Sequence, residues 1–97
     1  MAHYKVLVRG ENFIFLLDNE PTRLGFYATR FVEAKSYKAA EILALDLVRH
    51  DKKLGRVLNA RGDPPMLFID ELDEVPASNV ESTPGFTFFP ADSNSKT

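Results

Sequence analysis

The carboxylates of this sequence are most concentrated in DELDE, residues 70–74, directly after the apolar run MLFI at 66–69. An aspartate after an apolar strand helps to hold Mg²⁺ in nucleotide hydrolases, but their glycine-rich lysine loop is missing from the sequence. In a strand, neighbouring side chains point to opposite faces, which separates these carboxylates and disfavours a metal site. We therefore expect a charged strand that deters pairing at a sheet edge, with no metal or cofactor.

A basic stretch at residues 49–61 is the second group able to do chemistry, because clustered lysines and arginines bind phosphates. Its members are Arg49, Lys52, Lys53, Arg56 and Arg61. Acidic residues are interleaved with them, the net charge of the chain is −2, and no zinc-finger, RRM or KH signature is present. A nucleic-acid-binding accessory protein is therefore our second hypothesis.

Nucleophilic catalysis has little support in the sequence. The chain has no cysteine, its two histidines (His3 and His50) have no metal-binding spacing, and no serine stands in a G-x-S-x-G turn. We predict no catalytic residue. A small enzyme with a buried carboxylate, such as Asp70 or Glu71, is the third hypothesis, because burial can make an acid reactive. The letters RGD at 61–63 match an integrin-binding tripeptide, and we interpret the match as coincidence.

The first third of the chain predicts three strands. Residues 3–10 alternate between apolar and polar, residues 13–17 form a short apolar run, and residues 24–34 are rich in aromatic and branched side chains. A Gly-Glu-Asn turn at 10–12 and a polar connection at 18–23 separate them. We expect these strands to form an antiparallel meander.

A helix should follow, capped by Ser36 and running through residues 37–50. Its apolar residues fall at the i, i+3, i+4, i+7 spacing of one face, namely Ala40, Leu43, Ala44 and Leu47. A short helical turn and a fourth strand at 66–75 come next. The whole predicts an α+β fold, a two-layer sandwich with the aromatic C-terminal segment lying on the sheet.

Composition divides the chain into a domain at 1–75 and a tail at 76–97, rich in proline and serine, with an aromatic strand-like segment at 85–90. Residues 1–61 hold eleven Lys/Arg against seven Asp/Glu, and residues 62–97 hold one against seven. We expect the two parts to neutralise each other in the fold. The sequence shows no signal peptide and no membrane-spanning run, so we expect a cytoplasmic protein.

The strands are apolar on both parities, which is more apolar surface than one helix can cover. The tail, a second copy or another protein could cover the remainder. Our leading hypothesis is a non-enzymatic protein-interaction or homodimerising module. Its candidate interface residues are Leu7, Tyr27, Phe31, Phe86, Phe88 and Phe89.

Overall fold

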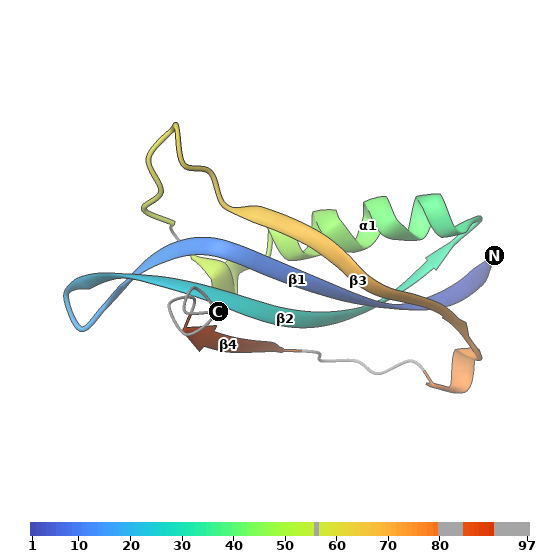
Figure 1. Cartoon of the computed structure of the whole chain (residues 1–97). Helices are drawn as coiled ribbons and strands as arrows, with labels where there is room; N and C mark the ends of the chain where they lie inside the picture. Colours follow the sequence, from blue (N-terminus) through green and yellow to red (C-terminus); the bar gives the residue numbers. More distant parts are fainter. Residues whose placement is uncertain (56, 80–84, 91–97) are drawn as a thin grey trace.

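The computed structural model, which describes residues 1–55, 57–79 and 85–90, shows an α+β fold: one antiparallel four-stranded sheet and one α-helix (Figure 1). In chain order, the elements are β1 (Ala2–Leu17), β2 (Glu20–Ala34), α1 (Tyr37–Arg49), the 3₁₀ turn η1 (Lys52–Leu54), β3 (Met66–Val75), the 3₁₀ turn η2 (Ala77–Asn79) and β4 (Phe86–Pro90).

The sheet is built around the β1–β2 hairpin, and the strand order is β3-β1-β2-β4. Asp18 and Asn19 form its two-residue turn with φ angles of 49° and 66°. Both values are positive, as in the tight hairpin turns whose twist matches that of the flanking strands. The aromatic segment at 86–90 returns to the sheet and pairs with β2 on the far side from β1.

The predicted reversal at residues 10–12 does not occur, because residues 2–17 form a single strand. The pairing of β1 with β2 shifts between Gly10 and Phe13, and Asn12 has a φ of 62°. The chain therefore uses a positive φ in a β-bulge, which inserts one extra residue without turning the strand. In place of the expected three-strand meander, the hairpin receives one later strand on each side.

Helix α1 begins as predicted, since the Ser36 hydroxyl accepts a hydrogen bond from the backbone N–H of Ala39 at 3.2 Å. The buried residues of the helix are Ala40, Ala44 and Val48. Leu43 and Leu47, which share the helical spacing with these alanines, are exposed at 43% and 49%. The two small alanines bring the helix close to the sheet, so the larger leucines lie beside the contact and not inside it.

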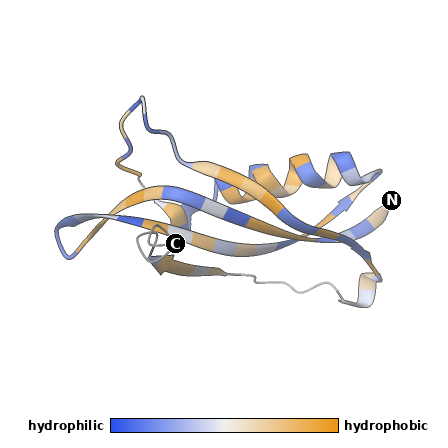
Figure 2. Cartoon of the chain, in the orientation of Figure 1, coloured by the Kyte–Doolittle hydropathy of each residue, from blue (hydrophilic) through white to orange (hydrophobic). Residues whose placement is uncertain are grey.

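The core lies between α1 and one face of the sheet, which we call the helix face. The helix contacts β1, β2 and β3. Most of the buried side chains come from the two central strands: Tyr4, Val6, Val8, Phe13, Phe26, Ala28, Val32 and Ala34. Figure 2 shows apolar and polar residues interleaved along these strands, as expected when the two faces meet different surroundings. In the described parts of the chain, no helix is long and apolar enough to cross a membrane.

Candidate interaction surface

The face of the sheet opposite α1, which we call the open face, is covered by no helix within the described ranges. Tyr4, Val6 and Val8 point to the helix, so the alternating residues between and beside them point away. Strand register then defines four rows across the sheet. They are Val75–His3–Glu33, Asp73–Lys5–Phe31, Glu71–Leu7–Thr29 and Phe68–Arg9–Tyr27.

A set of five apolar side chains on the open face reaches across its four strands. We call this set the apolar strip; it consists of Leu7, Tyr27, Phe31, Phe68 and Phe89. Tyr27 is 39% exposed and the other four are partly buried. The rings of Tyr27 and Phe89 lie 5.4 Å apart, and the Arg9 guanidinium lies 4.5 Å from the Phe68 ring centre.

A glycine on β2 makes room for one end of the apolar strip. A Cβ atom on Gly25 would lie 2.4 Å from the ring of Phe89, closer than carbon atoms can approach. On the helix face, a Cβ on Gly10 would lie 2.3 Å from the ring of Phe26. An aromatic ring therefore covers each of these two glycines, and the glycine lets the ring lie flat on the backbone.

Charged groups next to the apolar strip are sorted by sign between β1 and β3. Two basic residues, Lys5 and Arg9, lie on β1, where Arg9 pairs with Asp70 of β3 at 3.0 Å and also with Glu11. Lys5 lies between Phe31 of β2 and Asp73 of β3. The basic first part of the chain and the acidic second part thus meet on adjacent strands. A basic strand and an acidic edge strand lie side by side on this face.

The structure separates the predicted interface residues into two groups. Leu7, Tyr27, Phe31 and Phe89 share the open face. Phe86 and Phe88 pack on the helix side, where both rings contact Phe26 at 5.1 and 5.8 Å. Phe86 therefore packs against the core, while Phe88 remains 43% exposed at the edge of the sheet.

Phe68 was not among the predicted interface residues, although it lies on the open face. The pairing of β3 with β1 shifts beside Leu7, so Asp70 is an extra residue in β3. This bulge changes the alternation: Ile69 and Leu72 both pack against the core, while Phe68 points away. Strict alternation places Phe68 on the same side as Leu72, which is why sequence reasoning missed it.

Arg30 is the buried charged residue of the described chain, with a relative exposure of 6%. Its guanidinium donates to Asp51 at 2.9 Å and to the carbonyl of Thr29 at 2.7 Å. It also lies 5.0 Å from the ring centre of Phe86. A buried charge requires such partners. Arg30 therefore ties the end of the helical segment, β2 and β4 together, a role the sequence did not reveal.

The described members of the predicted basic patch lie on three successive segments: the end of α1, η1 and the loop that follows. Arg49 pairs with Asp46 at 3.0 Å and lines a cavity of about 350 Å³ beneath the 55–65 loop. Lys52 and Lys53 follow in η1, beside Asp51. Arg61 lies in a separate loop, and Arg56 lies outside the described residues. Acidic neighbours thus accompany most of the described cations.

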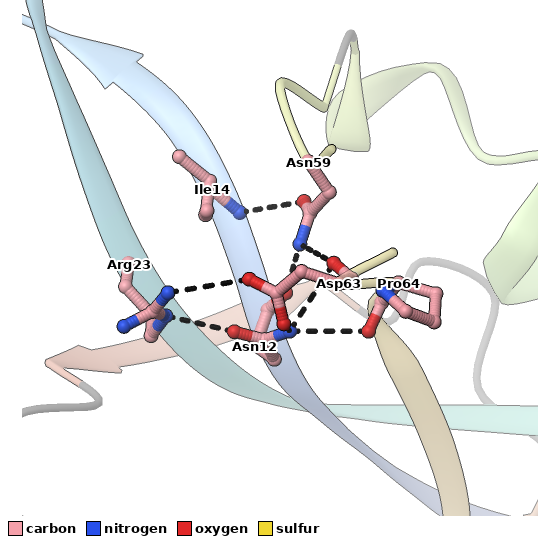
Figure 3. A network of polar contacts seen from close by, with 6 residues as sticks. All are labelled: Asn12, Ile14, Arg23, Asn59, Asp63 and Pro64. Atoms are coloured by element: carbon pink, nitrogen blue, oxygen red, sulfur yellow. Dashed lines mark hydrogen bonds and ion pairs between the residues drawn. The ribbon is translucent and has the colours of Figure 1, made fainter. Parts of the chain in front are cut away.

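A polar network holds the 58–64 loop to the β1 bulge (Figure 3). The Asn59 side chain accepts from the backbone N–H of Ile14 at 3.1 Å and donates to the carbonyl of Asn12 at 2.7 Å. Beyond the end of β3, this amide takes the place of a neighbouring strand on the edge of β1.

The same network fixes the Arg-Gly-Asp tripeptide. The Asp63 carboxylate accepts from the Asn12 amide at 2.8 Å and pairs with Arg23 at 3.4 Å. The backbone N–H of Asp63 donates to the carbonyl of Ala60, which closes a turn with Arg61 and Gly62 at its tip. The carboxylate thus points back onto the sheet, where it serves to hold the loop.

Among the described residues, the carboxylates are exposed or partly exposed, including Asp70 and Glu71. No group of three potential metal ligands is present in the same set of residues. The hydroxyl of Tyr4 is the group with a clear electrostatic perturbation. Burial raises the pKa of this hydroxyl, and the neighbouring Glu74 and Tyr37 raise it further. These groups lie on the helix face and form no catalytic arrangement with a base or a nucleophile.

Comparisons with known proteins add no relative. No family model, no curated protein and no solved structure matches this chain.

Proposed function

We propose that this chain is a non-enzymatic protein-interaction module whose contact surface is the open face of the sheet. The apolar strip carries the proposal, because no element within the described ranges covers it. Burying apolar surface contributes about 25 cal/mol per Å². A strip that extends over four strands therefore favours association with another protein.

The layout of the open face also resembles that of a protein interface. Apolar and aromatic groups lie at its centre, and Lys5, Asp73 and Glu71 lie around them. Interfaces are typically apolar at the centre and polar at the rim, and their strongest contacts are enriched in tyrosine and arginine. Tyr27 and Arg9, which are register partners, supply both residue types.

Site-specific photo-crosslinking in the native host tests this proposal. A photoreactive phenylalanine analogue at Tyr27 should give a protein adduct upon illumination. The same analogue at Ile42, which is 51% exposed on the outer side of α1, is the matched control and should give much less.

The mass of the adduct identifies the class of partner: twice the chain mass means a second copy, and another mass means a different protein. Adducts at Ile42 without adducts at Tyr27 would move the interface to the helix and contradict the proposal. The absence of adducts at Tyr27 would also contradict it.

A further inference from the structure

We infer that the partner of the open face is a second copy of this chain, packed sheet against sheet about a twofold axis that runs parallel to the strands between β1 and β2. This inference rests on the proposed function and adds the identity and geometry of the partner. It follows from how the charged and apolar rows of the open face can meet a copy of themselves.

Two copies that pack through the same face are related by a twofold axis lying between the two sheets. An axis running across the strands places every strand opposite its own copy. Acidic β3, with Glu71 and Asp73, would then face acidic β3, and basic β1 would face basic β1. Like charges brought together at an interface oppose association. The charge layout therefore disfavours this arrangement.

An axis that is parallel to the strands and lies between two of them places no strand opposite its own copy, and its position decides which strands meet. An axis between β1 and β3 places these two strands opposite each other. Because β3 is an edge strand, β2 would then project beyond the sheet of the second copy, and Tyr27 and Phe31 would find no strand opposite them. Leu7 would lie opposite Glu71 of the second copy, because the two residues share a row. An axis between β1 and β3 therefore leaves much of the apolar strip without an apolar partner.

An axis between β1 and β2 makes the face complementary to itself. Each β1 residue then lies opposite its own β2 register partner in the second copy, so Arg9 meets Tyr27 and Lys5 meets Phe31. Cations over aromatic rings attract, so both of these contacts favour association.

The other rows are compatible with the same axis. Leu7 meets Thr29 near the centre, where the threonine methyl group can pack on the leucine side chain. His3 meets Glu33 at one end of the strands, where a carboxylate beside an imidazole is favourable. No row of the two central strands therefore brings like charges together.

The same axis leaves the acidic residues in solvent. It places β3 opposite β4 of the second copy, but β4 pairs only with residues 24–28 of β2. Glu71 and Asp73 lie level with Thr29 and Phe31, beyond the end of β4. Both acids therefore keep their hydration at the rim, and no described strand of the second copy covers them. Face-to-face sheets pack about 10 Å apart with strands within about 30° of each other, so the rows can remain in register.

Mixing two charge-reversal variants tests this geometry. Glu33 of the second copy lies one row away from Lys5. In a dimer of the Lys5→Glu variant, the new carboxylate is therefore close to Glu33 of the second copy. In a dimer of the Glu33→Lys variant, the new ammonium group is close to Lys5 of the second copy. Each variant alone should associate about tenfold or more weakly than the wild-type chain. In an equimolar mixture each reversed residue meets an opposite charge, so a heterodimer should form with affinity close to that of the wild type. Sedimentation velocity on the full chains measures all three samples.

The mixture separates contacts between copies from contacts within one copy, because mixing cannot restore an intrachain pair. A Lys5→Glu chain mixed with an Asp73→Lys chain provides the geometric control, and it would be rescued only by the axis between β1 and β3. The inference is overturned if the first mixture associates no better than its components, or if only the control mixture is rescued. Adducts of another mass at Tyr27, with a monomeric purified chain, would overturn the inference but leave the proposed function standing.

Discussion

At the residue scale, two glycines and one buried arginine show how single positions set the two faces of the sheet. Gly25 seats Phe89 on the open face and Gly10 seats Phe26 on the helix face. Arg30 holds β4 through Phe86 and holds the end of the helical segment through Asp51. The sequence alone could not assign these roles, because they depend on which ring or carboxylate lies opposite in the sheet.

We expect Gly25→Ala to destabilise the chain by about 1–3 kcal/mol, because the new methyl group would collide with the ring of Phe89 and loosen β4. Urea unfolding measures the change in the free energy of unfolding. Gly62→Ala is the matched control, because nothing lies within 4 Å of a Cβ atom there, and it should be close to neutral. Equal effects of the two substitutions would show that Phe89 does not pack on Gly25.

Two arginine–aspartate pairs, one buried and one exposed, allow a comparison of how much each ion pair contributes to stability. Arg30→Met leaves Asp51 without its partner in a partly buried site, and we expect a loss of about 3 kcal/mol. Arg49→Met removes the exposed pair with Asp46 and should cost less than about 1 kcal/mol. Thermal or urea unfolding of both variants checks the difference. A smaller effect at Arg30 than at Arg49 would contradict the role of Arg30 in joining β4 to the core.

We expect the free energy of unfolding to fall at alkaline pH because of Tyr4. Its folded-state pKa is raised above the ordinary value of 10.0, so the native state holds this proton more tightly than the unfolded state. The stability contribution is therefore complete below about pH 10 and is lost as the pH rises above that value. Unfolding of the wild-type chain and of Tyr4→Phe between about pH 8 and pH 11 measures it. An identical alkaline decline in both proteins would refute the assignment.

At the element scale, local signals predicted most of the elements but not the bulges. The Ser36 cap, the helix after it, the strand at 66–75 and the aromatic strand all form where the sequence indicated them. Asn12 with its neighbouring glycine suits a turn and a bulge equally well, because both use a positive φ. The choice depends on pairing along the full length of β2, which is information from the whole sheet.

Sequence alternation likewise predicted the facing of some candidate interface residues but not of others. Simple alternation placed Leu7 on one face of β1, and placed Tyr27 and Phe31 on one face of β2; the structure puts all three on the open face. Alternation failed in β3, where the bulge at Asp70 reverses the direction of the side chains before it. It also did not separate Phe89 from Phe86 and Phe88, because the tail had no predicted register against the sheet.

At the scale of the whole molecule, the two faces of the sheet are unequal. One helix of 13 residues covers the helix face, and Phe86 packs against the core beside it. The open face keeps an apolar strip between a basic central strand and an acidic edge strand. A helix of that length spans about 20 Å, and it lies on one side of the sheet only. We therefore expect association with a second copy to cover the open face.

Sedimentation equilibrium of the full chain, alongside Phe31→Glu and Ile42→Glu, tests the face-to-face dimer. We expect a dimer for the wild-type chain, a monomer for Phe31→Glu, and a dimer for Ile42→Glu, since only the first substitution places a charge in the apolar strip. Circular dichroism confirms that both variants remain folded. A wild-type chain that stays monomeric at every concentration, or a dimer that only Ile42→Glu disrupts, would rule out the face-to-face dimer.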